Sequence, residues 1–244
     1  MLSKAKIKFV KSLQIKKYRK QEQCFVVEGK KSVLELLTSD FQVVTLLATQ
    51  QFLEESGSAT PPSVKVVAAT EAELASLGEY KSNDGALAVV RMKENESFVT
   101  SSAEYVLVLD DIRDPGNLGT IIRTADWFGV NKIVASEETA DVYNPKVIHS
   151  TMGSFTRVSI FYTDLVEYLS GKDPVYGTFL DGADVHDFSF GNGGFIVVGN
   201  ESQGISPQVE KVVTQRITIP SFGKAESLNA AIATGIVLDR VRGK

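Results

Sequence analysis

The 244-residue chain has a single cysteine, Cys24, and only two histidines, His149 and His186. One cysteine cannot form an intramolecular disulfide, and such low usage suits a reducing cytoplasm. These residues cannot provide a metal site of ordinary ligand spacing, so we predict no metal. No apolar run approaches the length of a membrane span, and the N-terminus lacks the apolar stretch of a signal peptide. We therefore expect a cytoplasmic protein with no membrane partner.

Two common nucleotide-binding motifs are also absent. No G-x-G-x-x-G follows the first expected strand of the second segment described below, and no G-x-x-x-x-G-K-[ST] occurs anywhere in the chain. An ordinary Rossmann or P-loop site is therefore poorly supported, and other loops must hold any nucleotide-like ligand. With 43% hydrophobic and 23% charged residues, the composition is that of an ordinary globular protein.

The formal net charge of −4 hides an asymmetry along the chain. Residues 1–20 contain no acidic residue and eight basic ones, which are Lys4, Lys6, Lys8, Lys11, Lys16, Lys17, Arg19 and Lys20. The other 224 residues carry 18 basic and 30 acidic residues. A basic end on an acidic body suggests a polyanion bound at one place, and a solvated helix face is the alternative.

Apolar runs and helical patterns divide the chain into two α/β segments. We predict one domain at residues 1–91, a polar linker at 92–104 and a second domain at 105–244. In the second domain the expected strands are 105–110, 132–136, 158–162, 175–181, 194–200 and 216–220, and the expected helices are 118–129, 144–152, 163–170, 206–213 and 228–241. Near-continuous apolar strands separated by helices indicate a mostly parallel sheet that is covered on both faces.

Three loops of the second domain carry polar residues at strand ends. In segment 109–130, Asn117 is a good cap for the following helix, and Arg123 follows about 1.7 turns later. Two interpretations remain open for this arginine. It either pairs with Asp111 or Asp114, or it faces an anion at the carboxyl end of the strand, where α/β sheets bind ligands.

The second loop leaves strand 194–200 through Gly199, Asn200 and Glu201 and turns at Gly204. A carboxylate at a strand exit is costly unless it has a partner, although a solvated loop position would also explain it. The flanking glycines indicate a loop built for close approach.

The third loop begins after Ile219 and Pro220 and ends where a helix starts. Either Ser227 or Asn229 can cap that helix. One cap does not require the four polar residues that are present, Lys224, Glu226, Ser227 and Asn229.

Together these loops resemble the three ordered motifs of the SpoU family, the ribose 2′-O-methyltransferases of the SPOUT superfamily. The matching patterns are N-x-G-x-x-x-R (Asn117, Gly119, Arg123), G-N-E-x-x-G (Gly199, Asn200, Glu201, Gly204) and I-P…E-S-L-N (Ile219, Pro220, Glu226, Ser227, Leu228, Asn229). The match spans residues 105–241. The stretch "KKYRKQEQCFVVEGKKSVLELL" is similar to the family's accessory RNA-binding domain, an α/β domain like certain ribosomal proteins.

The resemblance implies a deep trefoil knot, a homodimer whose site is completed across the interface, and S-adenosylmethionine as cofactor. The cofactor would be held mainly by backbone groups of the knotted loops. The implied cofactor-binding residues are Gly199, Asn200, Gly204, Ile219 and Leu228, with Thr178 and Leu180 as weaker candidates.

The implied reaction is attack of a ribose 2′-hydroxyl on the sulfonium methyl group, with Asn117 among the catalytic residues. The family's proposed activator of the hydroxyl corresponds to Arg123, but guanidinium stays protonated in proteins. We therefore expect Arg123 to hold the adjacent phosphate and to stabilise developing alkoxide charge. Glu201 would orient Arg123 or Asn117, and Ser227 and Asn229 would face the substrate ribose.

Three positions depart from the usual family pattern. Ser202 replaces glycine, Ala231 removes a hydroxyl, and His149 stands where many members carry arginine, which puts one RNA contact in doubt. The catalytic positions are unaffected, so we expect an active enzyme.

The expected partner is RNA, and the accessory domain favours ribosomal over transfer RNA by analogy. The predicted RNA contacts are Lys16, Lys17, Arg19 and Lys20, while Glu28 is expected to be a structural or turn residue. Three alternatives remain: methylation of transfer RNA, a non-catalytic knotted ribosome-assembly factor, and a small-molecule-binding α/β domain with a solvated basic arm.

Overall fold

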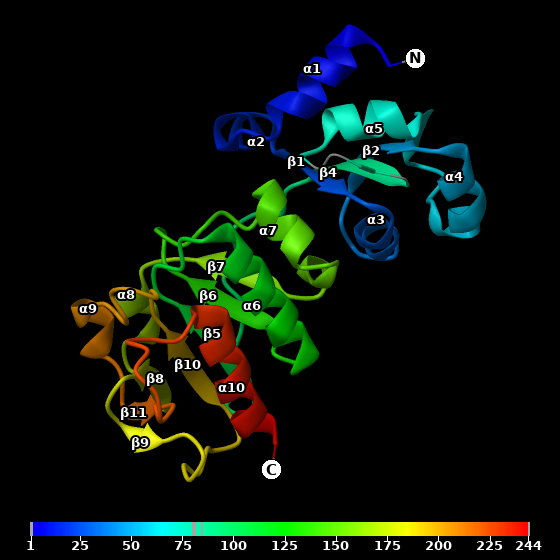
Figure 1. Cartoon of the computed structure of the whole chain (residues 1–244). Coiled ribbons are helices and arrows are strands. Elements are labelled where there is room, and N and C mark those ends of the chain that lie inside the picture. Colours follow the sequence, from blue (N-terminus) through cyan, green and yellow to red (C-terminus); the bar gives the residue numbers. More distant parts are fainter. Residues whose placement is uncertain (1, 80–81, 84, 244) are drawn as a thin grey trace. The chain divides into compact units, whose positions relative to one another are not determined.

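The computed structural model describes residues 2–79, 82–83 and 85–243. It divides into two compact units (Figure 1). The first unit contains the chain up to Glu94 together with Asp141–Thr156, and the second contains Asn95–Ala140 and the chain from Arg157 onward. The sequence predicts one continuous second domain from residue 105, and the structure differs because segment 141–156 belongs to the first unit. None of the described helices is long and apolar enough to cross a membrane.

The first unit is built on a four-stranded mixed sheet. Its elements are α1 (Lys4–Ser12), α2 (Lys16–Glu22), β1 (Cys24–Glu28), α3 (Lys30–Leu37), β2 (Val43–Ala48), α4 (Gln50–Ser56), η1 (Gly57–Ala59), β3 (Lys65–Ala68), α5 (Glu71–Leu77) and β4 (Ala86–Arg91). The strand order is β1-β4-β2-β3, with β4 antiparallel to both neighbours. Strands β1 and β4 are buried on both faces, which explains their continuous apolar sequences.

Each face of this sheet has its own apolar cluster. Val26 and Leu87 point to the face on which α1 and α5 pack through Val10 and Leu74. Alternate residues such as Val27 point to the other face, which α3 and α4 cover. Because successive side chains of a strand point to opposite faces of the sheet, β1, β2 and β4 each contribute apolar residues to both helix layers.

Segment 141–156 completes the second of these clusters. It contains α7 (Pro145–Ser150) and the 3₁₀ turn η2 (Ser154–Thr156). Phe155 lies edge-on to Phe25 with ring centroids 6.1 Å apart, and Tyr143 lies 4.6 Å from the same ring. The helix at 144–152 is thus confirmed, but its apolar side chains pack in the core of the first unit.

The second unit is a seven-stranded sheet. Its elements are β5 (Tyr105–Leu109), α6 (Pro115–Trp127), β6 (Lys132–Ala135), β7 (Ser159–Tyr162), α8 (Leu165–Leu169), β8 (Val175–Phe179), β9 (Ala183–Asp184), β10 (Gly194–Val198), α9 (Pro207–Glu210), β11 (Gln215–Thr218) and α10 (Ala230–Arg242). The strand order is β7-β6-β5-β10-β8-β11-β9, and every pair is parallel. The predicted parallel sheet is confirmed, and the short edge strand β9 was not predicted.

Helices cover both faces of this sheet. On one face α10 lies beside α6 (Figure 1). On the other, α8 and α9 pack through Leu165 and Val209 onto a cluster of strand residues that includes Val108 and Val197. Because parallel strands that are buried on both sides need apolar residues at successive positions, "YVLVL" and "GFIVV" read as continuous apolar runs.

The carboxyl ends of β5, β10, β8 and β11 are aligned. Leu109 pairs with Val198, and Phe179 pairs with Thr218. Strand β10 lies between β5 and β8. The chain continues from β5 to β6 on one side of the β5/β10 boundary and from β10 to β11 on the other side. Ligands of open α/β sheets bind at such a switch point. The first two motif loops leave from it, and the third leaves the same edge of the sheet after β11.

Replacing Phe155 by alanine tests the role of segment 141–156. Phe155 is 4% exposed, and its loss should lower the free energy of unfolding by about 3–5 kcal/mol. Urea unfolding followed by circular dichroism measures this change. The control Phe222→Ala, at a position 97% exposed, should leave the unfolding midpoint in place. Equal midpoints for the two variants would contradict the placement of Phe155 in this core.

Candidate active site

The first motif loop is held by aspartates. Asp114, rather than Asn117, is the N-cap of α6, and its carboxylate accepts a hydrogen bond from the Asn117 N–H at 2.8 Å. Pro115 occupies the first helical position, where its missing N–H costs nothing. Asp111 adopts a positive φ of 61° and pairs with the Arg113 guanidinium at 2.6 Å. The predicted cap at Asn117 is therefore wrong, and this residue lies inside the first turn with its amide free for other contacts.

The second motif loop closes on itself. Asn200 and Gly204 exchange backbone hydrogen bonds of 3.0 and 2.8 Å, and the Asn200 side-chain oxygen accepts bonds from the N–H groups of Ser202 and Gln203. The Asn200 amide donates to the Asp111 carbonyl at 2.9 Å, which ties this loop to the first one. Both the oxygen and the nitrogen of the Asn200 side chain therefore form hydrogen bonds within the protein.

Gly199 is required by close backbone approach. A Cβ atom at this position would lie 2.2 Å from the Gly204 carbonyl carbon and 2.3 Å from the Ile205 nitrogen. Gly204 has a different requirement, because its φ is +71° and the space around it is open. Gly199 is therefore required because a side chain would clash with backbone, and Gly204 because its φ is positive.

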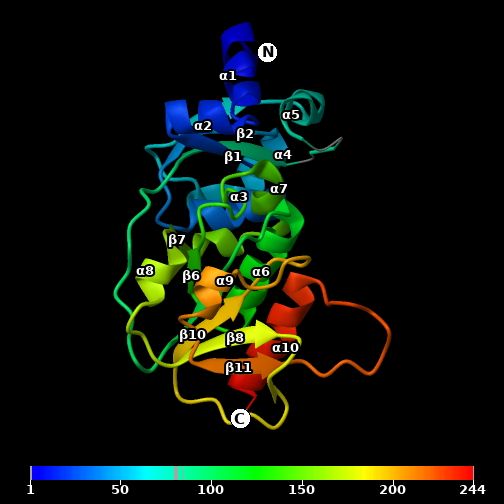
Figure 2. The same cartoon turned by 90° about the vertical axis from the view of Figure 1, so that its left-hand side faces the viewer.

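The third motif loop is exposed from Ser221 to Asn229 and extends away from the sheet before α10 begins (Figure 2). Asn229 is the N-cap of α10, and its side-chain oxygen accepts bonds from Ala231 N–H at 2.9 Å and Ile232 N–H at 3.3 Å. Of the two caps that the sequence allows, the structure selects this one. Ser227 is exposed.

A chain of side-chain hydrogen bonds joins all three motifs. The Asn117 amide nitrogen donates to the Glu201 carboxylate, and the Asn117 amide oxygen accepts from the Asn229 amide at 2.9 Å. A carboxylate can only accept, so Glu201 fixes which way the Asn117 amide faces. With its amide held in this direction, Asn117 can accept the hydrogen bond from Asn229. Of the two partners that we expected for Glu201, the structure shows Asn117.

Arg123 lies apart from this chain of contacts. It is exposed on α6, and its guanidinium forms no hydrogen bond or ion pair with the part of the chain that the structure describes. The interpretation in which it pairs with Asp111 is wrong, because Arg113 occupies that carboxylate. Its charge is therefore available to a ligand.

The predicted cofactor residues surround the carboxyl ends of β8, β10 and β11. The Thr178 hydroxyl donates to the Val197 carbonyl at 3.0 Å and so links β8 to β10. Leu180 is 83% exposed and Leu228 is 46% exposed. The sequence analysis does not single out Phe222, a lone aromatic in the polar third loop that is 97% exposed.

These residues fit S-adenosylmethionine. Leu180 follows β8, whereas Phe222 and Leu228 belong to the third motif loop, and each exposes an apolar side chain of the kind that contacts an adenine ring. The close-packed backbone at Gly199 offers polar groups without an intervening side chain. No group of three or more potential metal ligands occurs among the described residues.

The predicted RNA contacts divide into two kinds. Lys16, Lys17 and Lys20 are exposed on α2, as expected of residues that meet RNA. Arg19 is only 2% exposed, so its prediction as an RNA contact is wrong. Its guanidinium donates to the carbonyls after α1, including Gln14 at 2.9 Å, and pairs with Asp141 at 2.8 Å. The local sequence does not distinguish it from the neighbouring lysines, because its partner lies 122 positions away.

Two further residues of the first unit have framework positions. Glu28 is buried at the end of β1 and accepts a bond from Glu79 N–H at 3.2 Å. Burial lowers the pKa of the His149 imidazole, and the Glu79 carboxylate partly opposes that shift. A lowered pKa favours neutral imidazole, so His149 does not reproduce the permanent charge of an arginine.

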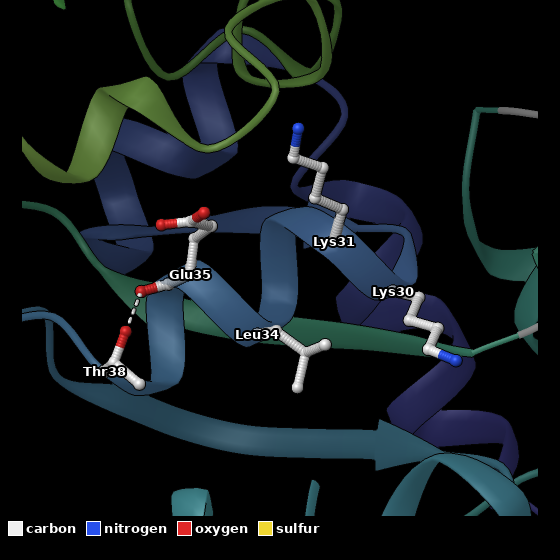
Figure 3. Close-up of a pocket in the computed structure, with 5 residues that line it drawn as sticks. All are labelled: Lys30, Lys31, Leu34, Glu35 and Thr38. Carbon is white, nitrogen blue, oxygen red and sulfur yellow. Dashed lines mark hydrogen bonds between the residues drawn. The ribbon is translucent and has the colours of Figure 1, made fainter. Parts of the chain in front are cut away.

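A surface depression of about 510 Å³ lies along α3. All the residues that line it belong to that helix or its end, and their side chains diverge (Figure 3). The Thr38 hydroxyl is bound to the Glu35 carbonyl at 3.0 Å. The depression along α3 therefore lacks the convergent polar groups of a binding site.

Known protein families match both parts of the chain. The SpoU rRNA Methylase family matches residues 104–239, and the MRM3-like substrate binding domain matches residues 4–88. The chain therefore belongs to the SpoU rRNA Methylase family. It is an RNA 2′-O-ribose methyltransferase that uses S-adenosylmethionine, as the three motifs indicate.

Individual relatives match either nearly the whole chain or only part of it. The 23S rRNA (guanosine(2553)-2′-O)-methyltransferase RlmP of Bacillus subtilis is 31% identical over 98% of this chain and 96% of its own length. The crystal structure of an AdoMet-bound rRNA methyltransferase from Sinorhizobium meliloti matches with a TM-score of 0.90 at 27% identity, over 100% of this chain and 96% of that one. The tRNA (guanosine(18)-2′-O)-methyltransferase of Aquifex aeolicus is 30% identical over 55% of this chain and 67% of its own length.

Alanine at Gly199 should damage the site more than alanine at Gly204. The Gly199→Ala side chain meets backbone, so the loop must shift, whereas Gly204→Ala incurs only the strain of positive φ, about 1–2 kcal/mol. Titration calorimetry with S-adenosylmethionine should show binding lost in Gly199→Ala and retained in Gly204→Ala. Wild-type affinity in Gly199→Ala would contradict the steric requirement.

Proposed function

We propose that this enzyme methylates a ribose of ribosomal RNA in the cytoplasm as a homodimer. The observation that carries the active-site assignment is the hydrogen-bond chain Glu201–Asn117–Asn229, which joins three loops at the carboxyl ends of the central strands. The choice of ribosomal RNA is supported by likeness over the full chain to an rRNA enzyme, whereas the transfer-RNA relative covers little more than half of it.

Arg123 acts on the substrate through its charge. S-adenosylmethionine supplies an electrophilic methyl group when bound. The exposed, unpaired guanidinium holds the phosphate next to the target ribose and stabilises negative charge as it develops on the 2′-oxygen. The proton leaves to water or to a phosphate oxygen, because guanidinium does not act as a free base.

Glu201, Asn117 and Asn229 position the loops around the reacting groups. Both ends of the Asn229 amide are occupied, by the N–H groups of α10 and by Asn117. We therefore assign Asn229 to positioning and Ser227, whose side chain is exposed, to contact with the ribose. Backbone groups of Gly199, Ile219 and Leu228 hold the cofactor.

The subunit interface lies on the α6/α10 face. Trp127 is 86% exposed and Ile232 is 56% exposed, which is unusual for large apolar side chains on two adjacent helices. Arg123 lies one helical turn before Trp127, so a partner subunit on this face completes the site. The return of the chain from β11 to α10, which packs beside α6, is compatible with the family's trefoil knot.

Methyl transfer from tritiated S-adenosylmethionine tests the function. Total RNA from a strain that lacks the gene is the substrate, separated into ribosomal and transfer fractions. We expect label in ribosomal RNA, with kcat reduced about 100- to 1,000-fold in Arg123→Ala and cofactor affinity unchanged. Label only in transfer RNA would reverse the substrate choice. Absence of label from both fractions and from assembling ribosomal particles, with cofactor binding intact, would favour a non-catalytic assembly factor.

The interface is tested by Trp127→Glu, which places a charge on the α6/α10 face. Sedimentation analysis should show a monomer, and methyl transfer should fall with it. Val99→Glu is the matched control, because Val99 is also an exposed apolar residue of the second unit, at 90%. A Trp127→Glu protein that remains a dimer would exclude this face as the interface.

A further inference from the structure

Helices α1 and α2 display lysines as two ordered rows. Lys4, Lys8 and Lys11 follow at spacings of four and three residues, so they share one face of α1 and extend over about 10 Å. All three are exposed, as are the α2 lysines Lys16, Lys17 and Lys20. Lys6 is excluded from the row because it is half-buried, and its pKa is lowered by burial and by Lys65.

Neither row has acidic partners within the described structure. None of the six lysines forms an ion pair with a described residue, and the first turns of both helices contain no acidic residue. Like charges four residues apart tend to destabilise a helix, and Lys4–Lys8 and Lys16–Lys20 are two pairs with this spacing. Glu73 of α5, which packs on α1, is engaged by the N–H groups of Leu2 and Thr70.

The rows belong to a fixed framework rather than to a loose basic arm. The Leu2 N–H donates to Glu73 at 3.0 Å, and the Gln14 amide donates to the Leu77 carbonyl at 3.3 Å, so α5 anchors both ends of α1. Buried Arg19 joins the end of α1 to α2 and to Asp141. Arg19 is thus a positioning residue that sets the two rows relative to each other.

We propose that the α1 row, Lys4, Lys8 and Lys11, continues the α2 lysines as one surface that binds the phosphate backbone of the RNA substrate. This inference rests on the proposed function and names the part of the first unit that holds the RNA. Over about 10 Å a nucleic-acid strand presents several phosphates, since a duplex carries one per about 3.4 Å of rise on each strand. Tyr18, 38% exposed between the α2 lysines, adds a ring on which an unpaired base can stack.

The salt dependence of RNA binding separates phosphate contacts from general charge. The full-length protein is titrated with a fluorescently labelled RNA hairpin of mixed sequence over a series of KCl concentrations. Lys4→Gln/Lys8→Gln/Lys11→Gln should weaken binding at low salt and reduce the slope of log K against log salt by about 2–3. The control is Lys93→Gln/Lys146→Gln/Lys211→Gln, which also removes three exposed lysines but lies outside the two rows, and it should leave the slope unchanged.

Methyl transfer by the same variants distinguishes this inference from the proposed function. The α1 variant should show a raised KM for RNA and an unchanged kcat, because the row lysines belong to the first unit and the active-site loops to the second. If wild type transfers methyl groups while the α1 variant keeps its KM and salt slope, the surface assignment is overturned and the function stands. A slope lost equally in the control would also overturn it, since net charge alone would then explain binding.

Discussion

A single acceptor-only carboxylate organises the active-site loops of this enzyme. Glu201 receives the amide of Asn117, and this leaves the Asn117 oxygen to receive Asn229, the cap of the last helix. An amide that turned around would present its oxygen to the carboxylate, which neither group can satisfy. The contact therefore joins three loops that are far apart in sequence, and the exposed Arg123 takes no part in it.

The parallel sheet makes this contact possible. Because the strands run in one direction, the loops after β5, β10 and β11 leave the same edge, and β10 lies between strands whose connections diverge. Tight backbone approach at Gly199 and the Asn200–Gly204 bridge then hold the second loop beside the first. Asn117, Asn200 and Asn229 form hydrogen bonds within this framework. Arg123, Ser227, Leu180 and Leu228, by contrast, are exposed.

In the first unit one basic side chain, that of Arg19, is buried among lysines that are exposed. Arg19 satisfies carbonyls after α1 and pairs with Asp141, while the surrounding lysines face solvent. Its partner comes from segment 141–156, which also supplies Phe155 and Tyr143 to the aromatic cluster around Phe25. The substrate-binding unit is thus built from two stretches of chain, and the second stretch is an excursion from the methylase sequence.

Local pattern was sufficient for six of the seven strands of the second unit and for its parallel sheet, because burial on both faces leaves continuous apolar runs. The N-cap at Asp114, the burial of Arg19 and the location of Phe155 were decided only by tertiary structure. In each case several neighbouring residues had the right chemistry, and the choice depended on a hydrogen bond, an ion pair or an apolar contact. The sequence determined which groups are present, and long-range contacts determined which of them are bonded inside the protein and which remain exposed.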